Sequence, residues 1–281
     1  MAAKKLSVVN QTPVRPDIYE YLDYRLFLKD WFAYQARRKK NYSMQDIAKL
    51  AGITPAYFSM ILNGKRVLTE TSFQKLEPHL GLSQAEVSYL KNLIQFADSK
   101  VHEQKHDALQ KLRRSSTFRS QNQGEVKVFQ YFAHWFIAAI RELAVLPEFK
   151  PDAKWIQSKL KKNVELSKIR KALDFLEENK LMPTDEDPDF SCTIPVFKVA
   201  MAQYHFEMLS LAATAIEDTP KEKRNILGHT FALDEKQIPE AKKILDEALE
   251  KIVELEKSSE QKDVIYQTEL ALFPLTNGET K

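Results

Sequence analysis

Two histidines in this sequence have the spacing of a zinc-binding pair. His102 and His106 stand on either side of Glu103 in the pattern H-E-x-x-H. On a helix this spacing places both imidazoles on one face, and the glutamate can act as a general base for a metal-bound water. The neighbouring side chains are polar and no third ligand is evident. We therefore expect a chance match, with no metal site and no catalytic residue.

Other signals of enzymatic chemistry are missing. Gly64-Lys65-Arg66 lacks the earlier glycine and the hydroxyl of a phosphate-binding P-loop. Cys192 is the single cysteine, which excludes an intrachain disulfide and a cysteine-based metal cluster. No run of about 18 apolar residues occurs, and the first residues lack the apolar core of a signal peptide. We expect a non-enzymatic protein of the cytoplasm, with no cofactor and no contact with a membrane.

The sequence from Ser43 to Arg66 predicts two short helices joined by a tight turn. Ser43 is a suitable N-cap for the first helix, and Gly52 can take the positive φ that ends it. Thr54 then caps the second helix, which stops at Asn63-Gly64. Two helices in this arrangement form the DNA-binding helix-turn-helix, whose second helix enters the major groove.

The second helix has an apolar side and an outer face, the latter made of Ala56, Tyr57, Met60 and Asn63. The whole stretch resembles the Cro and phage-repressor class of helix-turn-helix domains, whose cores end in a similar Asn-Gly followed by polar or basic residues. The resemblance implies that four residues face base edges: Pro55, Ala56, Tyr57 and Met60. It implies that four others contact phosphates: Thr54, Asn63, Lys65 and Arg66.

The outer face holds few of the side chains that usually read bases. Arg, Gln and Asn are absent ahead of Asn63, although these form bidentate hydrogen bonds with guanine and adenine. Thymine methyl contacts, the Tyr57 hydroxyl and DNA shape would have to carry specificity, so we expect a dimer to add discrimination. A glycine turn between two amphipathic helices also occurs in hairpins that bind no nucleic acid, and this alternative stays open.

The charge of the chain is unevenly distributed. Residues 1–120 have 20 Lys and Arg against 11 Asp and Glu, a net charge of +9, whereas residues 121–281 have 22 against 28, a net charge of −6. A cationic half is the electrostatic footprint of a protein that binds a phosphate backbone. A basic run before the helix-turn-helix could add phosphate contacts or complement the end of a helix: Arg37, Arg38, Lys39 and Lys40.

The N-terminal half predicts one all-helical domain between two irregular segments. Residues 1–16 have two prolines and no periodicity, which indicates a flexible arm. Residues 17–98 contain five helical patterns, of which the first covers 17–38 and the last begins with a Ser83 and Glu86 capping box. Residues 99–124 are polar and basic, so we expect a linker there, although its first part has a polar helical pattern.

The C-terminal half, residues 125–281, is expected to be a domain for dimerisation or effector binding. Within 125–196, helical patterns over 126–146, 152–161 and 166–179 precede two short predicted strands, 181–182 and 190–196. Three helices and a two-stranded hairpin in this order predict a winged-helix-like segment. Acidic residues at the tip of the hairpin would repel phosphate, which favours a scaffold or dimerisation role over a second DNA-binding surface.

The end of the chain, residues 197–281, predicts a helical and α+β unit. An apolar helix runs over 195–216, and a charged helix over 236–256 lies between predicted strands at 226–233 and 264–273. A strand, a helix and a strand within this length suit a small α+β unit. Such strands can pair within the chain or with a second protomer.

Four segments also resemble a family of bacterial transcription regulators that join a repressor-type helix-turn-helix to a C-terminal domain of unknown function. They are Tyr21-Leu-Asp-Tyr-Arg, the run from Gly81 to Leu90, the run from Leu176 to Met182, and the run from Val264 to Leu275. The resemblance covers nearly the full chain and implies DNA binding and the mainly α fold described above. It brings no catalytic residues.

These patterns together predict a sequence-specific regulator of transcription. We expect it to bind double-stranded DNA at an inverted repeat as a homodimer formed through the C-terminal domain, near the nucleoid in the cytoplasm. An effector of unidentified chemistry is compatible with the C-terminal domain. The alternative is a protein-interaction scaffold whose helix-turn-helix does not bind DNA.

Overall fold

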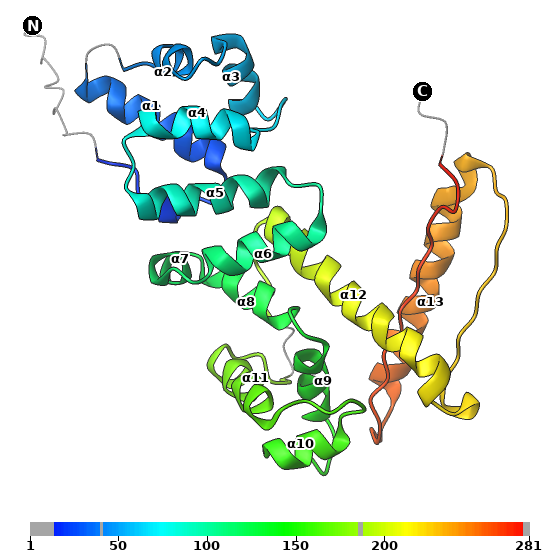
Figure 1. Ribbon diagram of the computed structural model, residues 1–281. Coiled ribbons are helices and arrows are strands. Elements are labelled where there is room, and N and C mark those ends of the chain that lie inside the picture. The colour runs from blue at the N-terminus through cyan, green and yellow to red at the C-terminus, as the bar shows by residue number, and fades with distance from the viewer. Residues whose placement is uncertain (1–13, 40–41, 185–187, 278–281) are drawn as a thin grey trace, which may run out of the picture. The chain divides into compact units, whose positions relative to one another are not determined.

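A computed structural model describes residues 14–39, 42–184 and 188–277 (Figure 1). These residues form helices and extended connections and contain no β-strand, so the chain is mainly α as predicted. Two compact units divide the chain, Met1–Val126 and Lys127–Lys281, and each is described by itself. No helix within the described ranges is long and apolar enough to cross a bilayer.

The first unit contains the five predicted helices of the repressor-type domain. They are α1 (Tyr24–Arg38), α2 (Met44–Leu50), α3 (Pro55–Leu62), α4 (Glu70–Leu80) and α5 (Gln84–Asp98). The pattern over 17–38 is not one helix, because a short 3-10 helix, η1 (Ile18–Glu20), precedes α1. The carboxylate of Asp23 accepts a hydrogen bond from the Arg25 amide at 2.8 Å, and this cap starts α1 anew.

Large aromatic side chains hold these helices together. Trp31 of α1 and Phe73 of α4 are each 1% exposed, and Phe58 of α3 is fully buried. The rings of Phe32 and Phe58 meet edge-on with centroids 5.8 Å apart, which joins α1 to α3. Burial of each such side chain contributes about 1.5–3 kcal/mol, so α3 is held from its apolar side and keeps its outer side free.

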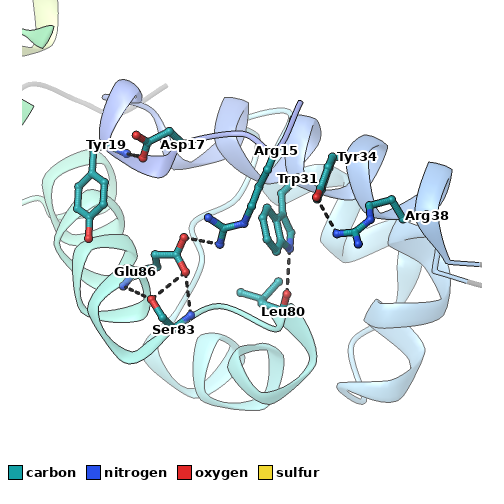
Figure 2. A network of polar contacts seen from close by, with 9 residues as sticks. All are labelled: Arg15, Asp17, Tyr19, Trp31, Tyr34, Arg38, Leu80, Ser83 and Glu86. Carbon is teal, nitrogen blue, oxygen red and sulfur yellow. Dashed lines mark hydrogen bonds and ion pairs between the residues drawn. The ribbon is translucent and has the colours of Figure 1, made fainter. Parts of the chain in front are cut away.

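A polar network fixes the ends of α4 and α5 against α1 (Figure 2). The Trp31 indole N–H donates to the carbonyl of Leu80 at 3.0 Å. At the start of α5, Ser83 and Glu86 form the predicted capping box, and Glu86 also pairs with Arg15 at 2.5 Å. The end of the predicted flexible arm is therefore held in place, whereas residues 1–13 lie outside the described ranges.

The prediction of a linker over 99–124 was wrong. This segment forms α6 (His102–Leu112) and α7 (Ser116–Gln121), whose apolar residues Leu112 and Phe118 are fully buried. The Arg119 guanidinium donates to the carbonyls of Arg113 and Arg114 at 2.8 and 2.9 Å, so the Arg119 side chain closes the end of α6. A few apolar residues at helical spacing suffice to fold the segment, even in a polar sequence.

The second unit has a helical core. Its helices are α8 (Gln123–Tyr131), α9 (Trp135–Leu143), α10 (Ala153–Lys159), α11 (Leu166–Glu178), α12 (Ile194–Asp218) and α13 (Ile238–Ser258), with short 3-10 helices η2 (Lys221–Lys223) and η3 (Glu235–Gln237). Ile140, Ile156 and Leu176 bring α9, α10 and α11 into one buried cluster. The pattern over 126–146 forms two helices rather than one, because the chain turns before His134. Helix α9 begins after this turn, and the Glu207 carboxylate of α12 accepts a hydrogen bond from the Trp135 amide at 2.6 Å.

The predicted wing was wrong. Leu181-Met182 forms no strand, and residues 190–196 do not pair either, because α12 begins at Ile194 with Pro195 in its first turn. Phe190 packs on Tyr131 instead, with ring centroids 4.7 Å apart, so this segment covers the helical core rather than forming a hairpin. The predicted acidic tip, residues 185–187, lies outside the described ranges.

The α+β interpretation of residues 197–281 was also wrong. The segments 226–233 and 264–273 run as extended chain, and the described residues offer them no partner strand (Figure 1). The alternation of apolar residues over 264–273 gives that segment one apolar face, but a strand also needs a neighbouring strand to pair its backbone N–H and C=O groups. The helices α12 and α13 were predicted correctly to within a few residues.

Substitution Phe118→Ala should lower the free energy of unfolding by about 3–5 kcal/mol, because a fully buried aromatic ring is lost from the first unit. Denaturant unfolding measures this effect. The exposed neighbour substitution Ser116→Ala is the control and should change it by less than about 0.5 kcal/mol. Equal, small effects of both substitutions would mean that this segment is a linker after all.

Glu86 should make the first unit sensitive to acid. Burial would raise its pKa, but the hydrogen bonds from Ser83 and the ion pair with Arg15 hold the pKa below its usual value. A carboxyl with a lowered pKa stabilises the fold above its unfolded pKa, and this contribution disappears as the pH falls through the folded pKa. The difference in unfolding free energy between the native protein and Glu86→Gln should therefore shrink between about pH 5 and pH 3. Glu103→Gln, which removes an exposed carboxylate of α6, is the matched control.

Candidate nucleic-acid interface

The predicted turn between two helices is present, with the expected chemistry at each position. Ser43 caps α2, since its hydroxyl accepts from the Asp46 amide at 3.1 Å and the Asp46 carboxylate accepts from the Ser43 amide at 3.2 Å. Gly52 takes φ +64° at the end of α2, a region that other residues rarely enter. Thr54 caps α3 through a 3.3 Å hydrogen bond from the Tyr57 amide, with Pro55 as the first helical residue. The local helix-turn-helix prediction is confirmed.

One side of α3 is packed and the other is open. Phe58, Ile61 and Leu62 are buried, whereas Ala56 and Met60 are exposed, Met60 by 44%. Pro55 and Tyr57 are half-buried at the edge of this surface. The four residues that the repressor resemblance assigns to base edges, Pro55, Ala56, Tyr57 and Met60, thus lie on the side of α3 away from the core. Their contact with DNA stays a prediction.

The end of α3 turns its predicted phosphate contacts toward solvent. Gly64 has φ +72°, and the Lys65 amide donates to the carbonyl of Met60 at 2.9 Å, which closes the helix with a Schellman motif. Thr54, Asn63, Lys65 and Arg66 are all exposed. This surface therefore has a hydroxyl at the start of α3, an amide at its end and two cations directly after it.

The basic run before α2 is partly engaged inside the domain. The Arg38 guanidinium donates to the Tyr34 hydroxyl at 2.7 Å (Figure 2), and the Lys39 ammonium lies 5.3 Å from the ring centroid of Tyr42. Arg37, Arg38 and Lys39 remain exposed. They keep their charge at the surface, so phosphate contact and a structural role both stay open, while Lys40 lies outside the described ranges.

An ion pair that the sequence did not reveal positions α3. Arg25 of α1 donates through Nε to the carbonyl of Ile61 at 3.1 Å and pairs with Asp98 at the end of α5. The Asp98 carboxylate also accepts from the Tyr24 hydroxyl at 2.7 Å and from the Leu68 amide at 2.8 Å. Burial and this hydrogen bond raise the pKa of Tyr24, which keeps the hydroxyl protonated as a donor. One carboxylate thus joins α1, α5 and the loop that follows α3.

A second residue missed by the sequence reasoning is Lys29. A shallow hollow beside the end of α3 is lined by Asp23, Arg25, Leu26, Lys29, Leu62, Asn63 and Gly64. Lys29 is exposed there, near the predicted phosphate contact Asn63. Because Lys29 follows Arg25 by four residues, the sequence places both on one face of α1, but nothing in the sequence shows that this face lies near α3.

The H-E-x-x-H pair starts α6. His102 and His106 have ring centroids 6.2 Å apart, and Glu103 is exposed. Among the residues that the structure describes, no group of three or more His, Cys, Asp or Glu side chains is placed to hold a metal ion. The absence of a metal site therefore stays a prediction for the chain as a whole.

This fold and this surface define a helix-turn-helix protein with an additional C-terminal domain. Residues 34–87 match the family model described as helix-turn-helix. Residues 115–275, more than half of the chain, match the domain of unknown function DUF4423, and the chain belongs to this family. The resemblance to regulators that join these two parts is thereby confirmed. Comparison with curated proteins and with solved structures gave no significant match.

Removal of the Asp98 carboxylate tests the role of the ion pair. Asp98→Ala should lower the unfolding free energy by about 3–5 kcal/mol, because Arg25 would stay largely buried without its counter-charge. Denaturant unfolding of the full chain measures the loss. Asp107→Ala, which removes an exposed carboxylate from α6, should cost less than about 0.5 kcal/mol. Similar values for the two variants would show that Asp98 does not organise the domain.

Proposed function

We propose that this protein is a DNA-binding regulator of transcription whose helix α3 enters the major groove. The observation that carries the proposal is the open side of α3, which follows a turn with helix-turn-helix geometry. The net charge of +9 over residues 1–120 supports attraction to a phosphate backbone. The matches of both halves of the chain to family models agree with this assignment.

Each predicted site residue has a chemical role in this proposal. Thr54 and Asn63 offer neutral donors to phosphate oxygens at the two ends of α3, and Lys65 and Arg66 add charge. Pro55, Ala56 and Met60 provide apolar contact, for which thymine methyl groups are the suitable partners, and the Tyr57 hydroxyl can donate or accept. Base reading of this kind discriminates weakly at one half-site.

Weak discrimination is the reason to propose a homodimer on an inverted repeat. Two copies related by a two-fold axis would place their α3 helices about 34 Å apart, or at a multiple of that distance. The free energies of the two half-sites then add, which raises specificity without further base contacts. Such a regulator would act at the nucleoid in the cytoplasm, and an effector would bind its C-terminal domain.

A scaffold that does not bind DNA is the second candidate. The observation that favours it is the apolar character of the exposed surface near the turn, where Met60 is 44% and Leu50 66% exposed. Such a surface also suits a protein partner. The two candidates differ in their response to salt, because protein contacts of this kind release few ions.

Binding to duplex DNA should weaken steeply as salt is added, with each phosphate contact adding about 0.9 to the log-log slope. The double substitution Lys65→Ala/Arg66→Ala should lower affinity for all sequences alike and reduce the slope by about 2. Tyr57→Ala and Met60→Ala should instead change the preference among sequences selected from a random pool. Fluorescence anisotropy at several salt concentrations measures the affinities.

Lys111→Ala, which removes an exposed cation from α6, is the matched control and should leave the slope unchanged. A flat salt response of the native protein would remove DNA binding and leave the scaffold. A change of sequence preference in the Lys65→Ala/Arg66→Ala variant alone would mean that α3 lies in the groove in another orientation.

A further inference from the structure

The last part of the second unit has no core of its own. From residue 209 to residue 277 no side chain is buried, and the four buried residues of α12 all lie at or before Met208. The last residues of this segment contact the rest of the unit: Ile265 packs on the helical core, and the Tyr204 hydroxyl of α12 donates to Gln267 at 3.1 Å. We name residues 209–275 the C-terminal arm.

The C-terminal arm exposes enough apolar surface for a stable interface. Of the 25 large hydrophobic side chains that are exposed in the described ranges, 16 lie in this arm, with Leu227 at 85% and Leu255 at 70%. Side chains of this size offer on the order of 1,000 Å² together at such exposures, judged from about 150–250 Å² for a whole aromatic side chain. A standard interface buries about 800 Å² per partner, so this area is sufficient for one.

The charge of the C-terminal arm selects a protein as its partner. Residues 209–275 have 14 Asp and Glu against 9 Lys and Arg, a net charge of −5. Nucleic acid and anionic lipid surfaces would be repelled. A helix such as α13, with no buried side chain, also gains little from its own chain, since isolated helices are marginal in water.

Five apolar residues of α13 have symmetric spacing. Ala241, Ile244, Ala248, Ile252 and Leu255 follow one another at intervals of three, four, four and three residues, so their spacing is the same from either end about Ala248, while Leu245, Leu249 and Val253 widen the apolar side on one flank. At 100° per residue the five fall within about 80° of the helix circumference. Ile244, Ile252 and Leu255 are 58%, 42% and 70% exposed. A surface that matches itself after reversal is the requirement of a two-fold interface.

Charged residues of opposite sign flank this stripe. When two copies of α13 lie antiparallel about Ala248, Lys242 of one lies two residues, about 3 Å along the axis, from the level of Glu256 of the other on one flank. Glu247 of one has the same two-residue offset from Lys251 of the other on the opposite flank. Each pair is of opposite sign and occurs twice. In a parallel pair, by contrast, Lys251 of one helix would lie at the level of Lys251 of the other, so like charges would meet.

We propose that α13 packs antiparallel against α13 of a second copy of this chain, with Ala248 at the two-fold axis. In this dimer Ile244 of one copy meets Ile252 of the other, and Ala241 meets Leu255. The small Ala248 side chains let the two helices approach closely at the centre. This inference rests on the proposed function, which needs a dimer to bind an inverted repeat.

Charge reversal on the full-length protein tests this arrangement. The native chain should be a dimer in sedimentation equilibrium without DNA. Lys251→Glu places a carboxylate against Glu247 at two symmetric positions and should raise the dimer dissociation constant at least about fivefold. Glu247→Lys should weaken the dimer similarly, and the double variant Glu247→Lys/Lys251→Glu should return to within about twofold of the native value. Ile252→Asp should abolish the dimer.

Glu250→Lys is the matched control, because Glu250 lies about 160° around α13 from the stripe and should leave the dimer unchanged. Circular dichroism confirms that each variant keeps its helices. A monomeric native protein at all concentrations would overturn the inference, as would equal effects of Lys251→Glu and Glu250→Lys, or no recovery in the double variant.

Failure of this inference can be told from failure of the proposed function. Dimerisation is measured without DNA, and DNA binding is also measured on a duplex with a single half-site, which needs no dimer. A native dimer that is weakened by each single charge reversal and restored in the double variant, but that does not bind DNA, would remove the proposed function alone. If the protein binds DNA but the charge-reversal variants do not change dimerisation as expected, the proposed dimer arrangement alone would be removed.

Discussion

The buried carboxylate of Asp98 is the contact on which the candidate DNA surface depends. It pairs with Arg25, accepts from the Tyr24 hydroxyl and holds the Leu68 amide, while Arg25 binds the last turn of α3. A charge removed from water in this way is stable only when its partners are in place, so the orientation of α3 and the docking of α5 are linked. The same helix α5 is fixed at its other end by Glu86, and it therefore carries both anchors of the domain.

This arrangement changes how the positive charge of the first unit should be interpreted. Several of its cations already have partners inside the domain: Arg15 with Glu86, Arg25 with Asp98, Arg38 with Tyr34, and Arg119 with two carbonyls. The net charge of +9 already subtracts the carboxylates of Glu86 and Asp98, so two of the 20 Lys and Arg are neutralised inside the domain, while Arg38 and Arg119 keep their charge. Exposed Lys65, Arg66 and Lys29 lie around the end of α3, which adds to the attraction at that end.

The sequence predicts those features of the fold that depend on interactions between nearby residues. The turn of the helix-turn-helix was predicted residue by residue, because its caps and its glycine act within three or four positions. The ion pair of Arg25 and Asp98 spans 73 positions, and no spacing rule reaches that far. Phe118 was missed in the supposed linker because polar neighbours masked its helical register. Predicted strands failed for the opposite reason, since apolar residues were present at 226–233 and alternated at 264–273, but the described residues contain no strand for either segment to pair with.

The apolar residues of these extended segments and the stripe of α13 have one physical explanation. Both are surfaces with an apolar side, and a sequence shows such a side whether its partner lies in the same chain or in another. The described residues give the C-terminal arm no internal partner that buries it, and its net charge is opposite in sign to that of residues 1–120. Opposite net charges would let one chain hold two interfaces that do not compete for the same partner. In the proposed assembly the dimer interface and the candidate DNA surface therefore belong to different units of the chain.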